Sequence, residues 1–268
     1  MTAFSADWLA LREPYDLRAR NPAVLAALEA TVASRPTLAI VDLACGAGAT
    51  LRAIAPRLAP AQSWRLVDND LRLLARASSE PGAAKKVATV PMDIARAFGT
   101  ALAGPVDLVT ASALLDLVSG DWLADLAKEI VARSLLFYAA LTYDGRVTFD
   151  PADPLDAAIV AAVNRHQRGD KGFGPALGPT AAFAAMARFE ASDYAIVRGA
   201  SDWTLGPRDG DIQGDLLAGW AAAARETGEL AFPAIDEWLA RRREHIAAGH
   251  SSIGVGHMDF FVRPASAL

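Results

Sequence analysis

The chain has 268 residues, of which 53% are hydrophobic and 21% charged, a composition typical of a globular protein with a sizeable core. A net charge of −5 disfavours nucleic acid as a partner, and the lone Cys45 with four scattered histidines excludes a disulfide framework and predicts no metal site. No uncharged apolar run reaches the roughly 18 residues of a membrane span, and the start lacks the layout of a signal peptide, so we expect a cytoplasmic protein that does not bind membranes.

Helical and strand-like segments alternate along the first half of the chain. Helices are expected at 6–12 and at 22–33, the second with Asn21 as N-cap and Pro22 in its first turn. Short apolar runs are typical of buried strands, and they occur at 38–44, 63–68, 86–93, 106–112 and 134–143. Helical patterns lie between several of these runs, at 49–59, 70–79 and 121–133.

Strands that alternate with helices predict a parallel sheet with helices on both faces. Right-handed crossovers place the runs 38–44 and 106–112 at the centre of this sheet. The fold class is therefore expected to be α/β, with a doubly wound, mostly parallel seven-stranded sheet.

The order of elements changes after residue 150. Helices near 154–168 and 179–190 precede a strand at 193–201, and helices near 211–227 and 233–247 precede a last strand at 255–263. The helical insertion 211–247 either caps the active site or merely decorates the fold. Its basic run, 241–243, stands beside glutamates and is expected to form a solvated helix face.

Small and acidic residues follow the predicted strands at their carboxyl ends. Gly46 and Gly48 lie in the turn after the first strand, where small residues let the backbone approach a ligand and a helix begins. Asp68 ends the second strand, where a carboxylate accepts hydrogen bonds from both ribose hydroxyls of an adenosine-type ligand. Asp93 ends the third strand, and a carboxylate there can accept from an adenine amino group. Open α/β sheets bind ligands at this edge; helix capping by these acids is the alternative.

This pattern resembles the class I S-adenosylmethionine-dependent methyltransferases, with a Rossmann-like fold. DLACGAG (42–48) is similar to their DLGCGxG signature, VDND (67–70) to their VDxS segment and MDIA (92–95) to their adenine-contacting strand end. The segment 106–118 is similar to their fourth strand and the turn after it. The resemblance covers roughly 38–143, and it departs from the family at Ala44, where glycine is usual, and at Asp70, where a small hydroxyl residue is usual.

The resemblance implies S-adenosyl-L-methionine as cofactor and S-adenosyl-L-homocysteine as product. Asp42 would orient the methionine amino group through the loop, and Ala44, Gly46 and Gly48 would let the loop pass the cofactor. The other implied cofactor residues are Asp68 for the ribose, Asn69, Asp93 and Ile94 around the adenine, and Ser112 and Leu115 near the methyl group. In relatives an N-terminal helix often closes over the cofactor, and here Tyr15 and Arg20 could touch it, with surface ion pairing as the alternative.

Residues of the acceptor site are predicted from chemistry alone. The segment 164–174 mixes a titratable ring, amides, an aromatic side chain and glycines, and 143–146 follows the fifth strand. We expect Tyr143 and His166 to be catalytic, with His166 as the base because its pKa lies near neutrality. Asn164, Lys171 and Phe173 would bind the substrate. A helix end with solvated charges is the alternative for this segment.

The sequence thus predicts an enzyme, a methyltransferase that acts on a small molecule. The whole chain, 1–268, is expected to be one methyltransferase domain: N-terminal helices at 1–35, a cofactor-binding core at 36–150 and a substrate-side half at 151–268. Two alternatives remain. One is a non-catalytic module that binds the adenosyl ligand. The other is a nicotinamide-dependent oxidoreductase, which the missing third glycine of the dinucleotide fingerprint at Leu51 disfavours.

Overall fold

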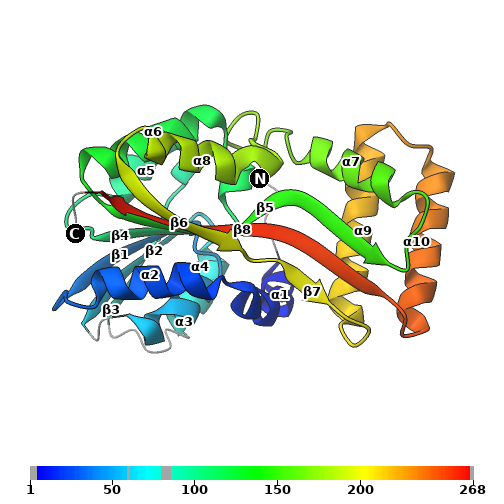
Figure 1. The fold of residues 1–268 in the computed structure, drawn as a ribbon, viewed down its shortest axis with the longest axis horizontal. Coiled ribbons are helices and arrows are strands. Elements are labelled where there is room, and N and C mark those ends of the chain that lie inside the picture. Colours follow the sequence, from blue (N-terminus) through cyan, green and yellow to red (C-terminus); the bar gives the residue numbers. More distant parts are fainter. Residues whose placement is uncertain (1–4, 59–60, 80–85, 266–268) are drawn as a thin grey trace.

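The computed structural model describes residues 5–58, 61–79 and 86–265, and its centre is a mixed, twisted sheet (Figure 1). Seven strands are hydrogen-bonded in the order β3-β2-β1-β4-β5-β8-β6, and the short β7 pairs with β8. β8 runs antiparallel to β5, β6 and β7, whereas β1 to β5 are parallel. The strands are β1 (Leu38–Leu43), β2 (Gln62–Asp68), β3 (Lys86–Pro91), β4 (Leu108–Ser112), β5 (Leu136–Asp150), β6 (Tyr194–Ala200), β7 (Trp203–Leu205) and β8 (Ser252–Pro264).

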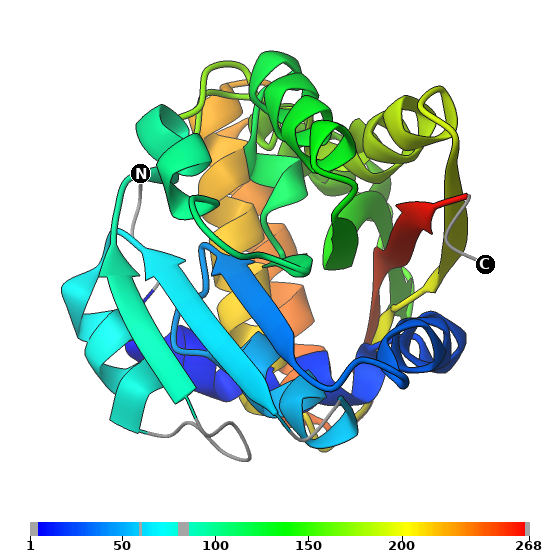
Figure 2. The same cartoon turned by 90° about the vertical axis from the view of Figure 1, so that its left-hand side faces the viewer.

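Helices cover both faces of the sheet, because each central strand is apolar on both of its sides. One hydrophobic core packs α2, α3 and α4 against one face, and a second packs α5, α6 and α8 against the other. Figure 2, seen from the β3 edge, shows β1, β2 and β3 running parallel with helices above and below them. The bounds are α2 (Pro22–Val32), α3 (Ala49–Ile54), α4 (Leu71–Ser79), α5 (Ile94–Ala101), α6 (Gly120–Ala132) and α8 (Ala181–Glu190).

A second lobe stands on the far end of the sheet, where β5 and β8 run on together as an antiparallel ribbon (Figure 1). Three helices pack against this ribbon around a third hydrophobic core. They are α7 (Asp156–His166), α9 (Gly210–Thr227) and α10 (Phe232–Ala247). The first helix, α1 (Ala6–Ala19), lies between the two lobes. We call this second lobe the cap.

The predicted fold class is confirmed, including the central position of β1 and β4 and the capping of α2 by Asn21, whose side chain accepts from the amides of Ala23 and Val24. The predicted helix 49–59 is confirmed as α3 with a 3-10 turn at 55–57; residue 59 lies outside the described residues. The helix α5 and the strand β7 were not predicted. Both are short, and β7 exists only through its pairing with β8.

Three predicted boundaries or environments are wrong. The first helix does not end at residue 12 but continues to Ala19, with Pro14 inside it. The proline removes a helical hydrogen bond, and the ion pair between Arg12 and Asp16 spans the same turn. The fifth strand does not end at Tyr143 but continues to Asp150, because β8 pairs with it along that length. In the basic run of α10, Arg243 is exposed as expected, but Arg242 is fully buried on an ion pair with Asp156.

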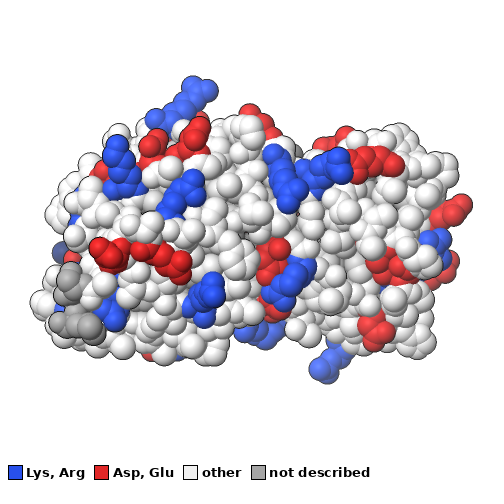
Figure 3. All heavy atoms as spheres, turned by 45° about the horizontal axis from the view of Figure 1, so that its top comes forward, with Lys and Arg blue, Asp and Glu red and all other residues white. Residues whose placement is uncertain are grey.

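The charged side chains of the face in Figure 3 are interspersed, with basic and acidic groups next to one another. This face therefore shows no basic stripe of the kind that follows a nucleic-acid backbone. Within the described ranges, none of the helices combines the length and the apolar character needed to cross a membrane. The same ranges hold no group of three or more histidine, cysteine, aspartate or glutamate side chains placed to bind a metal ion.

Candidate functional site

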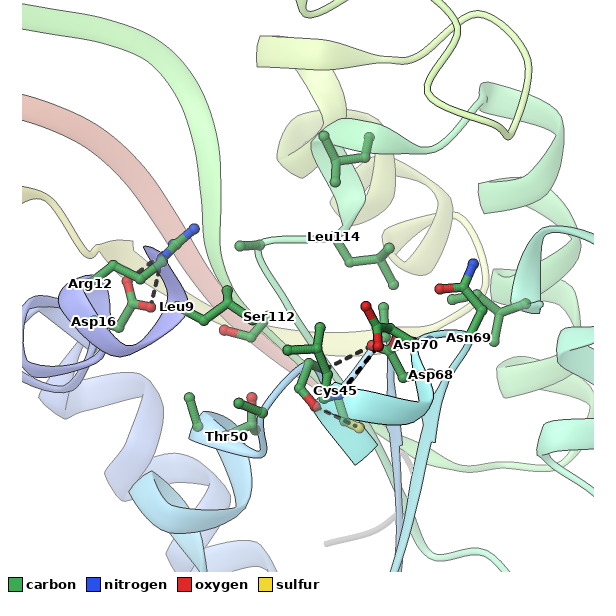
Figure 4. Close-up of a pocket in the computed structure, with 18 of the residues that line it drawn as sticks. Leu9, Arg12, Asp16, Cys45, Thr50, Asp68, Asn69, Asp70, Ser112 and Leu114 are labelled. Carbon is green, nitrogen blue, oxygen red and sulfur yellow. Dashed lines mark hydrogen bonds and ion pairs between the residues drawn. The ribbon is translucent and has the colours of Figure 1, made fainter. Parts of the chain in front are cut away.

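A pocket opens at the carboxyl ends of the parallel strands, the edge at which open α/β sheets bind ligands (Figure 4). Its walls come from α1, the turn between β1 and α3, the end of β2, the turn between β3 and α5, the turn after β4, and Phe173. Seven of the predicted site residues line it: Ala44, Gly46, Asp68, Asn69, Ile94, Ser112 and Phe173.

The turn between β1 and α3 needs glycine at two positions. Gly46 has φ +52°, and a Cβ added there would lie 3.3 Å from the Cδ1 atom of Leu9 on α1. Gly48, the N-cap of α3, has φ +85°, and its added Cβ would lie 3.1 Å from the Cβ of Ala77. Ala44 also has a positive φ, +51°, which suits the glycine that the family signature carries there. The turn is thus a tight cradle whose backbone faces the pocket.

Asp68 holds this turn in place from the end of β2. Its Oδ2 atom accepts a hydrogen bond from the amide of Gly46 (2.8 Å), and its Oδ1 atom accepts one from the amide of Asp70 (2.9 Å). The residue is 8% exposed and lines the pocket. Each carboxylate oxygen has a second lone pair, so the group can still accept two hydroxyl hydrogen bonds from a ligand.

Asp42 lies behind the turn and does not line the pocket. It is buried; its Oδ1 atom accepts from the hydroxyl of Thr110 (2.7 Å), and its Oδ2 atom has no hydrogen-bond partner in the described structure. Burial raises the pKa of this carboxyl to about 7, although the charge of Arg20 acts in the opposite direction. Its orienting role remains a prediction.

Arg20 lies beneath the floor of the pocket. Its guanidinium donates to the hydroxyls of Tyr138 (3.1 Å), Ser112 (3.3 Å) and Thr50 (3.5 Å), and the last two line the pocket. Its Nε atom is buried without a partner among the described residues. A carboxylate that reached the floor between Ser112 and Thr50 would meet this guanidinium.

Four other predicted cofactor residues lie outside the lining. Gly48 is the N-cap of α3. Asp93 caps α5 by accepting a hydrogen bond from the amide of Ala95 (3.1 Å), which is the alternative to an adenine contact given for this residue above. Leu115 is buried in the core, and the Tyr15 hydroxyl donates to Asp209 (2.9 Å).

The predicted acceptor residues, Phe173 apart, also lie outside the pocket lining. Because β5 runs on past Tyr143, that side chain packs in the hydrophobic core of the cap, and its hydroxyl donates to Asn164 (2.8 Å). The ammonium of Lys171 donates to Nδ1 of His166 (3.3 Å), whose Nε2 atom pairs with Glu226 (2.8 Å). These side chains tie α7 to β5 and to α9, so the structure does not bring them to the pocket.

Sequence reasoning missed the residues of α1 that form one wall: Leu9, Arg12, Glu13 and Asp16. Arg12 and Asp16 form a two-bonded ion pair (2.9 and 3.1 Å), and the Trp203 indole also donates to Asp16 (3.1 Å). Glu13 pairs with Arg52 of α3 at 2.6 and 2.7 Å. The helical spacing of these four residues is the signal that would have found them.

A scan against protein-family models and a search of curated proteins gave no match. Solved structures match nearly the whole chain. The cyclopropane synthase MmaA2 from Mycobacterium tuberculosis is 11% identical with a TM-score of 0.51, over 97% of this chain and 94% of its own. A cyclopropane-fatty-acyl-phospholipid synthase-like protein from Lactobacillus casei is 13% identical with a TM-score of 0.54, over the same shares. A methyltransferase from Geobacter sulfurreducens, solved with S-adenosyl-L-homocysteine, is 14% identical with a TM-score of 0.47, over 98% of this chain and 100% of its own.

At these identities the likeness shows the fold. The fold expected from the resemblance to class I S-adenosylmethionine-dependent methyltransferases is confirmed. It includes the strand order and the antiparallel strand β8 next to β5.

Proposed function

We propose that this chain is a methyltransferase that binds S-adenosyl-L-methionine in the pocket and passes its methyl group to a small molecule. The position of Asp68 is the observation that carries the proposal. Its carboxylate stands at the end of β2, accepts hydrogen bonds from two backbone amides and lines the pocket. This is the geometry that an adenosine ribose requires. The whole chain would act as one methyltransferase domain.

The residues that line the pocket support a placement for each part of this cofactor. Asp68 would hold the ribose, while Asn69, Met92 and Ile94 would flank the adenine. At the other end, Thr50, Ser112 and the guanidinium of Arg20 would receive the methionine carboxylate. The lining contains four acids, Glu13, Asp16, Asp68 and Asp70, and one basic residue, Arg12, so its net charge suits a sulfonium cation with an ammonium group.

The cofactor, when bound, supplies an electrophilic methyl group on a sulfonium. The protein then has to align the acceptor with that group and to exclude water. Leu9, Leu114, Leu117 and Phe173 give the pocket apolar walls. The ion pair between Glu13 of α1 and Arg52 of α3, and the hydrogen bond from the Trp203 indole to Asp16, hold the α1 wall in place. Reactions of this type need a base only where the acceptor has a proton to lose.

Calorimetric titration with S-adenosyl-L-homocysteine tests the proposal. We expect micromolar binding by the wild-type protein and at least tenfold weaker binding by Asp68→Ala, about 1.4 kcal/mol. Asp125→Ala, on the exposed side of α6, is the matched control and should bind like the wild type. Circular dichroism of each variant reports that it is folded.

Absence of binding by folded wild-type protein would overturn the proposal, and binding of reduced nicotinamide cofactor instead would support an oxidoreductase. If S-adenosyl-L-homocysteine binds but no acceptor of any class is ever methylated, the chain is a binding module.

A further inference from the structure

Arg52 of α3 contacts the turn between β1 and α3 without lining the pocket. Its Nη1 atom donates a hydrogen bond to the carbonyl oxygen of Ala47 (2.7 Å), and a Cβ added to Gly48 would lie 3.3 Å from the same nitrogen. Ala47 lines the pocket and is 6% exposed. Because the peptide bond is planar, a fixed Ala47 carbonyl also fixes the amide of Gly48. Arg52 therefore holds the turn by a carbonyl, as Asp68 holds it by the amide of Gly46.

The rest of the Arg52 guanidinium binds Glu13 of α1. Its Nε and Nη2 atoms donate to the two carboxylate oxygens of Glu13, at 2.6 and 2.7 Å, in the two-bonded geometry that a planar guanidinium favours. The two side chains are 20% and 29% exposed, so the pair is partly shielded from solvent. All three nitrogens of Arg52 thus have a partner, and the pair connects α1 to the turn.

This ion pair also sets the charge beside the pocket. Arg52 brings a positive charge to the turn, and an unpaired positive charge there would repel a cationic ligand. The carboxylate of Glu13, which lines the pocket, cancels that charge and leaves the hydrogen bond to Ala47 intact. S-adenosyl-L-methionine carries a sulfonium cation, whereas S-adenosyl-L-homocysteine carries a neutral thioether sulfur. The two ligands therefore differ in how strongly they respond to a charge at this wall.

We propose that Arg52 is a positioning residue for the turn, and that Glu13 sets the preference of the pocket between the sulfonium cofactor and the thioether product. This inference rests on the proposed function. Arg52 holds the backbone of the turn in the shape that lines the pocket. Glu13 allows a cationic side chain to do so next to a cationic ligand.

Calorimetric titration of each protein with both ligands, at low ionic strength, tests the inference. Glu13→Gln leaves the Arg52 charge unpaired, so we expect the affinity for S-adenosyl-L-methionine to fall by about threefold relative to that for S-adenosyl-L-homocysteine. Arg52→Met leaves the Glu13 carboxylate unpaired, so the ratio of the two affinities should change by about threefold in the opposite direction. The lost hydrogen bond to the turn should also weaken binding of both ligands to Arg52→Met by about tenfold. High salt should reduce both changes in the ratio, because it screens the charges.

Arg52→Lys separates the two roles of the arginine. Lysine keeps the charge but lacks the planar set of donors that reaches Glu13 and Ala47 together. We expect this variant to bind both ligands more weakly than the wild type, with the wild-type ratio between them. The matched controls are Glu29→Gln and Arg57→Met, which break a surface ion pair between α2 and the 3-10 turn after α3. Both controls should bind the two ligands like the wild type, and circular dichroism reports that each variant is folded.

Two results overturn the inference: a wild-type ratio in both Glu13→Gln and Arg52→Met, or a change of the ratio in the same direction in both. The wild-type titration comes first and separates this failure from that of the proposed function. If the wild type binds neither ligand, the proposed function fails. If it binds them and the ratio does not respond to the two variants, only the roles of Glu13 and Arg52 fail.

Discussion

Arg242→Ala is expected to lower the free energy of unfolding by about 3–5 kcal/mol, the usual cost of breaking a buried ion pair by removing one partner. The guanidinium of Arg242 is fully buried in the cap, donates to Asp156 and to the carbonyl oxygen of Pro151 (2.6 Å), and lies 4.3 Å from the centre of the Phe149 ring. Its loss leaves the Asp156 carboxylate, 14% exposed, without a cation and with hydrogen bonds from the Trp238 indole (2.8 Å) and the Asp153 amide (2.7 Å). Urea unfolding followed by circular dichroism measures the effect.

Arg243→Ala is the matched control, because this neighbouring arginine is exposed on the same helix. Surface substitutions of this kind change stability by about 0.5 kcal/mol or less. If both variants unfold at the same urea concentration as the wild type, the buried ion pair does not hold the cap together. Replacement of the pair by a matched apolar pair is a separate experiment, since it leaves no charge unpartnered.

Relative to the wild type, Asp116→Asn is expected to gain about 2–3 kcal/mol in free energy of unfolding when the pH is raised from 4 to 8. The folded-state pKa of Asp116 is raised, to about 6, above its value of 3.8 in the unfolded chain. A raised pKa favours the folded state fully below pH 3.8, and this contribution is lost as the pH rises through 6, because the carboxylate is then buried with its charge. Asparagine has no such charge, so the variant escapes the loss.

Thermal unfolding of both proteins across this pH range gives the comparison. Asp42, whose pKa is raised to about 7, also destabilises the folded state as the pH rises, but it is present in both proteins and cancels in the difference. The opposite outcome, a stability difference that does not change between pH 4 and pH 8, would mean that Asp116 is well solvated in the folded protein.

The side of the pocket proposed to bind the cofactor could be predicted from the sequence because it depends on local pattern. Asp68 and the turn around Gly46 follow short apolar strands, and the carboxyl ends of neighbouring parallel strands meet at one edge, so each position followed from its strand. Right-handed crossovers likewise predicted β1 and β4 at the centre of the sheet, which is where they lie.

The acceptor side could not be predicted in this way, because it depends on contacts between distant segments. The length of β5 is set by β8, more than a hundred residues later, and this pairing moves Tyr143 away from the strand ends. Arg242 looks like a surface residue in the sequence, and only the position of Asp156 on α7 shows it to be buried. Asp116 stands in an otherwise apolar segment, and its burial is visible only in three dimensions.

The place of β8 has a consequence for how this chain folds during synthesis. β8 is the last strand along the chain, yet it lies between β5 and β6 and forms half of the ribbon that carries the cap. Among the described residues it is the only strand paired with β6 and with β7. While residues 252–264 are still inside the ribosome, β6, β7 and the outer half of β5 have no partner strand and expose unpaired backbone edges. The half of the sheet formed by β1 to β4 can assemble as it emerges, whereas the cap has to wait for the final strand. A pause in translation before residue 252 would therefore hold the nascent chain in its most aggregation-prone state.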